Sequence, residues 1–388
     1  RTATLTLTSG TLTQNIIIEQ ESAEFVNLEQ NIYNVSVEGG ELDIRFSTNI
    51  AEDELLIYGS LGTGTWLTQE TKTRASSSYM LNLTVLPNTD GVSRTAYIYF
   101  VKVTDMESIV VEMVTIIQRG EVASESTDYS SDKKVRVLQT AKLGKGLPIV
   151  LMGDGFIDTE INDGTYDAVM DKAFENLFTE EPIKSLRDYF NVYAVTAVSK
   201  HNIFGTGYET ALGCELAGGN STGISGEDNA VQRYVQCVDN IDMSETLAVV
   251  ILNSPAYAGT TYFGYTNQTK VVEFAIAYCP VIYDLQSESF RQVLVHEAVG
   301  HGFAKLEDEY AYQENGTISS KEIKNVQYLQ TLGWAQNVDF TSDPSQVLWS
   351  AFLNDNRYVS EKLGVFEGAC TYIKGAYRPS EESMMNSN

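Results

Sequence analysis

The chain has 388 residues, of which 43% are hydrophobic and 20% charged, a composition typical of a folded protein and not of a disordered one. This length exceeds one ordinary hydrophobic core, so we expect two or three domains. The formal net charge of -26 leaves no basic stripe for phosphates, which argues against nucleic acid as a partner and against binding to anionic lipid.

Short apolar or alternating segments, separated by turn residues, fill the first 120 residues. They predict strands without a helical period, which is typical of an antiparallel, Ig-like β-sandwich. The predicted strands are TATLTLTSG, NIIIEQ, YNVSVEGG, ELDIRFSTN, ELLIYGS, YMLNLTVLPN, TAYIYFVKV and VVEMVTIIQRG.

An internal repeat is visible between Arg1–Gln20 and Arg94–Gly120. Both segments begin Arg-Thr-Ala, continue as strand, turn and strand, and end near a Gln. We therefore expect residues 1–20 to be the last hairpin of a preceding sandwich module and residues 21–120 to be a complete second module. The alternative is a coincidence between two amphipathic hairpins.

The second module resembles the BACON domain of Bacteroidetes. The resemblance depends on Trp66, on the strand start Arg94-Thr95-Ala96 and on the closing Ile116-Ile117-Gln118. It implies an N-terminal β-sandwich that binds carbohydrate or mucin, or that acts as a plain spacer.

Residues 121–134 are polar and rich in Ser, so we expect a linker. The period then changes, and strands alternating with a helix predict an α/β domain over residues 135–388. The predicted helix covers 165–178 and places Tyr166, Val169, Ala173 and Leu177 on one face. The predicted buried strands are PIVLMGD, FNVYAVTAV, ETLAVVILN and VVEFAIAY.

Two further features of this domain leave alternatives open. Asp154 and Asp158 follow the first buried strand and form either a polar turn or a structural Ca²⁺ site, although their spacing does not fit an EF-hand loop. Cys214 and Cys237 flank a loop-rich segment and are either a disulfide or buried free thiols.

The segment VLVHEAVGHGFAKLEDEY, residues 293–310, contains two of the three histidines of the chain. His296 and His301 are five residues apart, and in a regular α-helix that spacing separates their directions by roughly 140°. A π-bulge absorbs one extra residue and returns such positions to one face, and Gly300 tolerates the altered backbone. We therefore predict a bulged helix from Phe290 to about Ala304, capped by Ser289, with two histidines on one metal ion.

The motif HEAVGHGFAKLEDEY resembles the immunoglobulin A peptidase family of metzincin-like zinc metallopeptidases, in which H-E-x-(x)-G-H precedes Leu-x-Asp-Glu-Tyr. Leu306, Asp308, Glu309 and Tyr310 match that tail, and YRPSEESMMN matches a later segment of the family. The resemblance implies one catalytic Zn²⁺ held by His296, His301 and Asp308, with Glu309 and Glu307 as competitors for the third position. Met385, or Met384, would form the Met-turn beneath the metal.

The resemblance also implies a mechanism in which Glu297 is the general base that deprotonates a zinc-bound water, with Tyr310 as a candidate for stabilising the oxyanion. The predicted function is a zinc-dependent endopeptidase acting on host or dietary proteins or glycoproteins. The alternative is an adhesin or glycan- or mucin-binding protein with a degenerate metal domain. A serine hydrolase lacks support, because histidine, the usual base for the serine, is too scarce in this chain.

The sequence contains no run of about 18 apolar residues, so we expect no membrane span. Few Lys and Arg residues, with many Tyr, Thr, Ser and Asn, are typical of an exported protein. We expect a monomer that is secreted or held at the outer surface, with its signal segment absent from this sequence.

Overall fold

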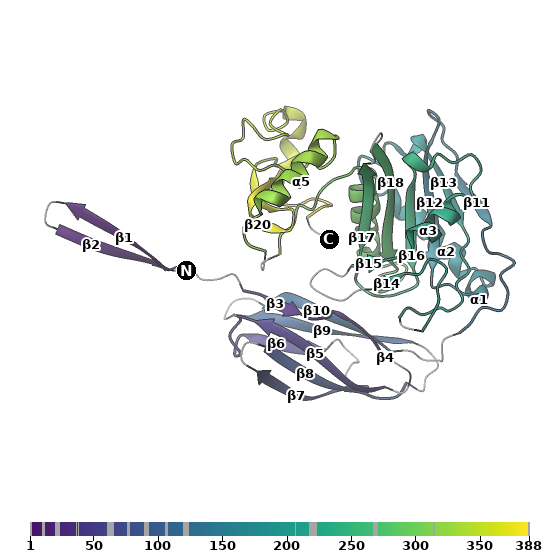
Figure 1. Cartoon of the computed structure of the whole chain (residues 1–388), viewed down its shortest axis with the longest axis horizontal. Helices are drawn as coiled ribbons and strands as arrows, with labels where there is room; N and C mark the ends of the chain where they lie inside the picture. The colour runs from purple at the N-terminus through teal and green to yellow at the C-terminus, as the bar shows by residue number, and fades with distance from the viewer. Residues whose placement is uncertain are drawn as a thin grey trace.

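The computed structural model describes residues 2–9, 12–19, 24–35, 37, 39–59, 66–75, 78–88, 93–104, 108–118, 124–205, 207–216, 223–266, 271–312 and 315–386. Figure 1 shows four parts along the chain: a hairpin, a β-sandwich, an α/β domain and a C-terminal subdomain of residues 305–386. The C-terminal subdomain and the α/β domain lie beside each other above the sandwich (Figure 1).

The sandwich consists of two four-stranded sheets. The first has the order β3 (Val26–Leu28), β5 (Gly40–Thr48), β8 (Ser78–Val85) and β7 (Leu67–Ala75). The second has the order β4 (Ile32–Val35), β10 (Ser108–Gln118), β9 (Arg94–Val103) and β6 (Leu55–Gly59). Side chains of both sheets, among them Phe46, Phe100 and Ile116, share one core, because alternate residues of each strand face inward.

The predicted sandwich strands are present, with two differences. The sandwich is not wholly antiparallel, because β4 pairs with β10 in parallel. The sequence analysis also missed β3, which has three residues, and β7, whose sequence LTQETKTRA is too polar to give an apolar signal. Trp66 and Arg94, two residues of the predicted module, meet with the Arg94 guanidinium 4.5 Å from the Trp66 ring centroid.

Strands β1 (Thr2–Ser9) and β2 (Leu12–Glu19) pair in antiparallel fashion as a hairpin. Figure 1 shows this hairpin apart from the sandwich. Its antiparallel strand pairing parallels that of β9 with β10, and its origin in a preceding module stays a prediction.

The described part of the expected linker, residues 124–134, is attached to the α/β domain. Ser126 donates its hydroxyl to the carbonyl of Ser199 at 2.7 Å, and the Asp158 carboxylate accepts the backbone N–H groups of Thr127 and Asp128. Asp132 accepts a hydrogen bond from the Tyr234 hydroxyl at 2.8 Å. The polar residues that suggested a linker therefore serve as hydrogen-bonding partners of the folded domain.

The α/β domain is built on a six-stranded sheet with the order β11 (Val135–Gln139), β13 (Phe190–Val195), β12 (Leu147–Asp154), β16 (Leu247–Leu252), β18 (Val271–Pro280) and β17 (Thr260–Thr266). The four predicted strands are the central, mutually parallel ones, and they are mostly apolar because both of their faces are covered. The two strands that the sequence analysis missed, β11 and β17, are the antiparallel edges.

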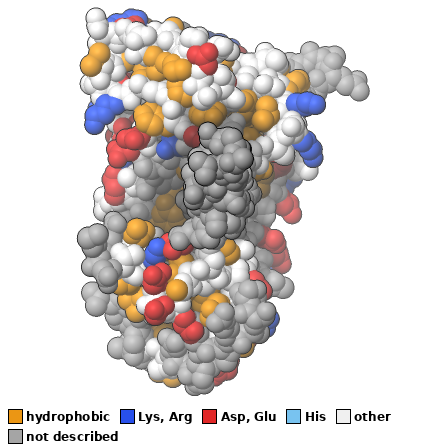
Figure 2. Space-filling view, turned by 90° about the vertical axis from the view of Figure 1, so that its left-hand side faces the viewer, with side chains coloured by type: hydrophobic (Ala, Val, Ile, Leu, Met, Phe, Trp, Pro, Cys, Tyr) orange, Lys and Arg blue, Asp and Glu red, His pale blue; other side chains and the backbone are white. Residues whose placement is uncertain are grey.

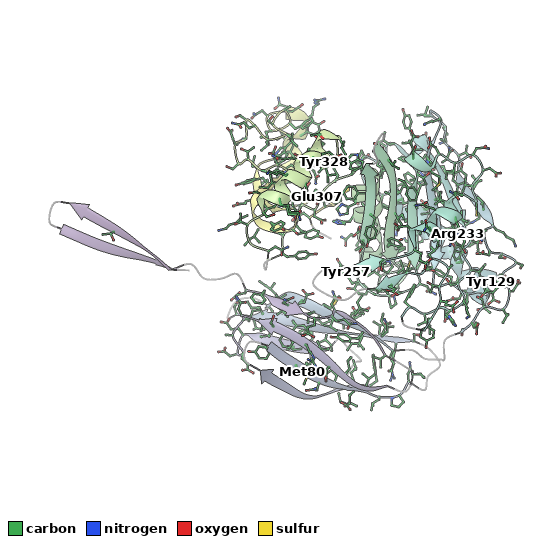
Figure 3. The ribbon with its side chains drawn as sticks, viewed as in Figure 1. Met80, Tyr129, Arg233, Tyr257, Glu307 and Tyr328 are labelled. Atoms are coloured by element: carbon green, nitrogen blue, oxygen red, sulfur yellow. The ribbon has the colours of Figure 1, made fainter. Side chains whose placement is uncertain are left out.

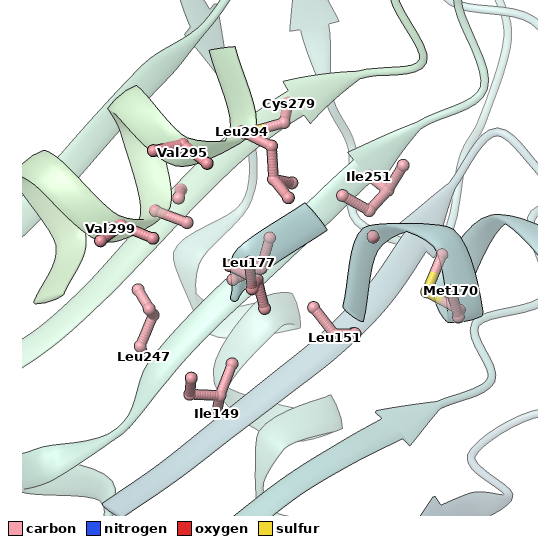
Figure 4. Packing of buried hydrophobic residues seen from close by; sticks show 14 of the residues in the cluster. Ile149, Leu151, Met170, Leu177, Leu247, Ile251, Cys279, Leu294, Val295 and Val299 are labelled. Carbon is pink, nitrogen blue, oxygen red and sulfur yellow. The ribbon is translucent and has the colours of Figure 1, made fainter. Parts of the chain in front are cut away.

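Helices cover both faces of this sheet. On one face α2 (Thr165–Leu177), α4 (Glu288–Leu294) and the π-helix η4 (Val295–Phe303) pack on alternate strand residues such as Leu151, Val249 and Cys279. Figure 4 shows this cluster, with Leu177 and Leu294 close to Ile251. On the other face α3 (Asp228–Val235) packs on the remaining strand residues. The helix predicted over 165–178 is α2, and its four predicted core residues are buried.

The C-terminal subdomain has a small core of its own, which includes Val326, Val338 and Ala376. Its elements are α5 (Ser320–Thr331), the 3₁₀-helix η5 (Asn356–Glu361) and the hairpin β19 (Phe366–Ala369) and β20 (Tyr372–Arg378). The remaining elements of the chain are α1 (Asp158–Asn162), the 3₁₀-helices η2 (Arg187–Tyr189) and η3 (Met243–Glu245), and the hairpin β14 (Glu215–Leu216) and β15 (Ile224–Ser225).

The open questions about Asp154 and the cysteines have structural answers. The buried Asp154 carboxylate accepts hydrogen bonds from the hydroxyls of Ser199 and Thr210 and from the N–H groups of Leu212 and Cys214. These donors satisfy both oxygens of the Asp154 carboxylate, which is the arrangement expected of a polar turn. Cys214 and Cys237 are free thiols. Among the described helices, none has the length and apolar character needed to cross a membrane.

Candidate metal centre

The histidine helix begins about two turns before His296, at Glu288. Ser287 is the N-cap and accepts a hydrogen bond from the Phe290 N–H at 3.0 Å. The predicted cap, Ser289, is wrong by two residues and lies inside α4, because Ser287 is the residue with extended backbone. At Val295 the regular helix changes to the π-helix η4, which continues to Phe303. The predicted bulge is thus confirmed, and it extends over nine residues instead of one turn.

The π-helix brings the two histidines together. Its hydrogen bonds join residues five apart, so positions at that spacing lie on one face of the helix. The rings of His296 and His301 meet edge to face, with centroids 4.8 Å apart. Nε2 of each ring lies 3.2 Å from the same atom, Oδ1 of Asp308.

The other ring nitrogens fix the orientation of the imidazoles. Nδ1 of His301 is 2.8 Å from the carbonyl oxygen of Leu306, and Nδ1 of His296 is 2.8 Å from that of Met384. A carbonyl oxygen only accepts, so each Nδ1 is the donor, and Nε2 is the nitrogen available to a metal.

Asp308 arrives from the opposite side through a turn after η4. The turn is made by Lys305, whose φ of 55° is in the left-handed region, and Leu306 closes it by donating its N–H to the Gly300 carbonyl at 3.0 Å. A lysine thus occupies a left-handed position of the kind that glycine most often fills.

These three side chains fit a zinc ion. The ligand atoms of His296, His301 and Asp308 all lie within 4.8 Å of one another. Tetrahedral zinc with bonds of about 2.0–2.2 Å requires its ligand atoms to be about 3.3 Å apart, and the two nitrogen–oxygen distances of 3.2 Å agree with this. Two imidazoles and one carboxylate are a donor set typical of catalytic zinc sites. Among the described residues, this is the one group of this kind.

The charges of the group are strongly coupled. Burial disfavours the ionised Asp308, but hydrogen bonds from His296 and His301 outweigh it and hold the pKa of Asp308 well below its usual range. Burial also opposes a charged His301, and the hydrogen bond and charge of Asp308 overcome this and raise the pKa of His301 to about 9. The pocket therefore favours a carboxylate with positive charge beside it, which a metal cation would supply.

Glu297 lies next to this group at the wall of the same cavity. The Thr261 hydroxyl of β17 donates to its Oε2 at 2.7 Å and holds the carboxylate in place. Burial raises the pKa of Glu297, although the neighbouring histidine charges act against that shift. Gly259 is required here, because a Cβ atom at that position would lie 2.6 Å from Oε1 of Glu297.

Met385 lies on the other side of the π-helix and is fully buried. A Cβ atom at Gly300 would be 2.1 Å from Sδ of Met385, so the sulfur packs directly on the helix backbone between the two histidines. The turn that contains Met385 is anchored to the site, because Glu309 donates its N–H to the Met385 carbonyl at 2.8 Å. Met384 meets His296 through its carbonyl and not through its sulfur.

The competitors for the third metal position lie outside the His-His-Asp group. The Glu309 carboxylate accepts hydrogen bonds from Ser383 Oγ at 2.7 Å and from Asn337 Nδ2 at 2.9 Å, outside the histidine group. Glu307 lines the cavity, and burial raises the pKa of its carboxyl to about 7. His201 lies elsewhere in the α/β domain, where its Nδ1 accepts the N–H of Glu209.

A cavity of about 670 Å³ opens over the site, between β17, η4 and the residues that follow η4. Tyr310 lines this cavity, and its ring centroid is 6.1 Å from that of His296. Burial, followed by the charge of Asp308, raises the pKa of the Tyr310 hydroxyl, so the hydroxyl keeps its proton.

Sequence reasoning missed three residues of this site. Gly259 and Thr261 belong to the edge strand β17 and its approach, where TTYFGYT gives a weak strand signal and no chemical motif. Asn337, which holds Glu309, lies in a loop after α5 and is identifiable only by its contacts.

Acidic side chains are scattered over the face of the molecule shown in Figure 2, in keeping with the net charge of -26. Lys and Arg side chains are few on this face and lie mostly near its margins (Figure 2).

Comparisons with known proteins follow the same division of the chain. Residues 51–119 match the BACON family, described as "Putative binding domain, N-terminal". Among solved structures, a Bacteroides ovatus GH5 xyloglucanase in complex with a XXXG heptasaccharide is 16% identical over 28% of this chain and 21% of its own, with a TM-score of 0.19. The GspB Siglec domain is 15% identical over 29% of this chain and 66% of its own, with a TM-score of 0.20. No curated protein sequence matches significantly.

Residues 135–360, more than half of the chain, match the family described as IgA Peptidase M64. The match includes η4 and Asp308, and it ends before the turn with Met385. It confirms the resemblance inferred from the histidine motif. The α/β domain with its His-His-Asp group is the part of the chain that the family describes, and this chain is a member of the IgA peptidase M64 family of peptidases.

Proposed function

We propose that the protein is a zinc-dependent endopeptidase that hydrolyses peptide bonds in the cavity above His296, His301 and Asp308. The observation that carries the proposal is the convergence of three ligand atoms, with Glu297 beside them, on a cavity of about 670 Å³. Zinc in this position would polarise the scissile carbonyl and lower the pKa of water at the site.

Glu297 is the general base of the proposed reaction. Its carboxylate, fixed by Thr261, takes a proton from the attacking water and later delivers that proton to the leaving amine. Burial raises its pKa, which brings the carboxyl closer to the operating pH and suits a group that must both accept and donate a proton.

Tyr310 and the edge strand complete the arrangement. The protonated Tyr310 hydroxyl is available to donate a hydrogen bond to the developing oxyanion. Strand β17 stands at the end of the sheet order and lines the cavity through Thr260, Thr261 and Phe263. An extended peptide that pairs with this edge would lie across the site, as in other cases of strand addition.

Met385 is the proposed Met-turn residue of a metzincin-like site, since it packs beneath the helix that bears both histidines. We also propose that the protein is exported and acts on host or dietary proteins, glycoproteins among them. The composition, with few Lys and Arg and many Tyr, Thr, Ser and Asn, supports an exported protein.

The test combines metal analysis with an assay. Purified protein is expected to contain about one zinc per chain by elemental analysis and to cleave casein. Adding a chelator is expected to stop this cleavage. Glu297→Gln is expected to keep its zinc and lose at least about 100-fold in kcat, because the base is removed and the ligands are not. The matched control is Glu160→Gln, because the Glu160 carboxylate accepts hydrogen bonds from Ile157 and Asn253 away from the site. This variant is expected to cleave casein. Full activity of Glu297→Gln would refute this role.

A glycan- or mucin-binding protein is the second candidate, favoured by the match of the sandwich to a family described as a binding domain. Zinc-loaded protein that binds mucin and leaves both mucin and casein intact would establish this function instead.

A further inference from the structure

The sandwich contributes a wall to the cavity of the metal centre. Met113 and Thr115 of β10 line the cavity that His296 and Glu297 also line. Val114, between the two lining residues, points into the sandwich core, so Met113 and Thr115 project from the opposite, outer face of their sheet. The wall of the cavity is therefore the outer face of a sheet that continues beyond the cavity.

Contacts between the two domains hold this face in position. Ile32 of β4 and Ile117 of β10 pack on the core of the α/β domain. Tyr97 of β9 meets Tyr283 of the α/β domain edge to face, with ring centroids 5.1 Å apart. The ring of Tyr283 lies 6.3 Å, between centroids, from that of Tyr257, which lines the cavity. Figure 3 shows Tyr257 where the α/β domain approaches the sandwich.

A row of apolar side chains crosses the outer face from the cavity outward. In the strand order β10, β9, β6, Met113 is opposite Tyr99, and Tyr99 is opposite Tyr58. Residues opposite each other in paired strands project from the same face, and the rings of Tyr99 and Tyr58 have centroids 5.4 Å apart. Two strand spacings of about 4.8 Å make the row about 10 Å long, the length of about three residues of an extended peptide.

The outer end of this row is open to solvent. Tyr58 is 46% exposed, and Leu56, which lies on the same face of β6, is 50% exposed. Thioether and phenol groups carry no charge at neutral pH, so the row suits an apolar group and not an ion. Exposed apolar side chains that form one patch mark a binding surface, and this patch is continuous with the cavity at Met113.

The position of the row identifies what it binds. A polypeptide cleaved at the metal centre extends beyond the cavity, and the wall with Met113 leads directly to Tyr99 and Tyr58. Tyrosine rings supply a large contact area at a low cost in conformational entropy. Contacts between two aromatic rings and between sulfur and an aromatic ring are both favourable, so an aromatic side chain matches a row of one methionine and two tyrosines.

We infer that the outer face of β10, β9 and β6 is a substrate-binding surface, and that it binds an aromatic side chain of the polypeptide several residues from the bond cleaved at the metal centre. This inference rests on the proposed peptidase function and adds to it a class of substrate. Tyr58 and Tyr99 are specificity residues, because they bind the outer part of the substrate and take no part in bond breaking.

The experiment compares the zinc-loaded full-length protein with the double variant Tyr58→Ser, Tyr99→Ser. Cleavage of a proteome-derived peptide library, followed by mass spectrometry, identifies one preferred site, and a short peptide covering only that site is made. Six residues are then added at either end, with a central Phe-Tyr pair or with Ser and Gly in its place. Tyr129→Ser is the matched control, since Tyr129 is 47% exposed and lies on the far side of the α/β domain from Tyr257 (Figure 3).

We expect the aromatic extension at one end to lower the KM of the wild type at least about tenfold relative to the Ser-Gly extension, with kcat unchanged. In the double variant this ratio should fall to about twofold or less, while KM and kcat for the short peptide stay at their wild-type values. Tyr129→Ser should keep the wild-type ratio. An equal loss on short and extended peptides, or no benefit of the aromatic pair in the wild type, overturns this inference.

Other occupants of the row give other results. A wild type that sediments as a dimer, with the double variant as a monomer, would place a second copy of the chain on the row. A glycan on the extension that lowers KM where the aromatic pair does not would place a sugar chain there. Either result overturns this inference and leaves the proposed function intact. Wild-type protein that carries zinc and cleaves no peptide overturns the function itself, and this inference with it.

Discussion

Sδ of Met385 packs against the backbone of Gly300, the residue that directly precedes His301 in the π-helix. The contact joins the end of the described chain to the helix that bears His296 and His301. It explains why a glycine occupies a buried helical position where alanine would ordinarily be more favourable by about 1 kcal/mol.

Gly300→Ala should therefore destabilise the protein, against the helix propensity of alanine. A Cβ atom 2.1 Å from Sδ forces the methionine to move, which typically costs about 1–3 kcal/mol. The measurement is urea denaturation of Gly300→Ala, Met385→Ala and the double variant. We expect the double variant to lose less free energy of unfolding than the two single variants lose in total. Gly316→Ala, where a Cβ atom meets open space, should change the free energy of unfolding by less than about 0.5 kcal/mol. Equal stabilities of Gly300→Ala and Gly316→Ala would refute the contact.

The assignment of the third metal ligand makes a second prediction. Asp308→Asn should weaken zinc binding by more than about 100-fold, since even residues that only support a ligand cost 10–100-fold. Glu309→Gln should bind zinc within about tenfold of wild type, because the Glu309 carboxylate is bonded to Ser383 and Asn337. Competition with a chromophoric chelator measures both affinities. The reverse order of the two variants would make Glu309 the ligand.

The spacing of the histidines makes a third prediction. Deleting Val299 leaves the histidines four apart, and a regular α-helix then places them on one face, so zinc binding should survive within about tenfold. Inserting one alanine after Val299 leaves them six apart, with no helical form that unites them, and should abolish binding. Circular dichroism checks that both proteins fold. If the insertion variant binds zinc and the deletion variant does not, the π-helix is not what joins the histidines.

The sequence predicted the centre of this molecule better than its edges, for physical reasons. The buried strands β12, β13, β16 and β18 are mostly apolar, and a histidine pair in a chain with three histidines is a strong chemical signal. The edge strand β17 alternates weakly, so Thr261, which orients Glu297, was missed. The role of Lys305 as the turn residue was missed because left-handed backbone is ordinarily assigned to glycine.

The approach of the sandwich to the metal centre was also beyond the sequence. Ile32 and Ile117 read as ordinary strand residues, and nothing in their pattern shows that they pack on a second domain. Contacts between domains depend on the shapes of two finished folds, so the position of Met113 in the wall of the cavity follows only from the structure.

Lys305 gives the last prediction, which concerns stability and pH. Its side chain is 6% exposed and donates a hydrogen bond to the carbonyl of Gly302, which lies in the last turn of the π-helix. Burial lowers the pKa of the Lys305 ammonium to about 8, although the charge of Glu273 acts in the opposite direction. In the unfolded chain the pKa of this lysine keeps its ordinary value of 10.5. The buried charge therefore destabilises the folded protein below pH 8.

Replacing this lysine with a neutral residue, in the variant Lys305→Met, should stabilise the protein at pH 7. The lowered pKa corresponds to about 3 kcal/mol, and the lost hydrogen bond offsets about 1 kcal/mol, leaving a gain of about 2 kcal/mol. Between pH 8 and pH 10.5 the folded wild type releases the proton while the unfolded chain still binds it, so wild-type stability rises and the advantage of the variant shrinks. Urea denaturation across this range measures the difference. Lys362→Met, at an exposed lysine with a similar φ of 50°, should show no such convergence, and a pH-independent gain at Lys305 would contradict a buried charge.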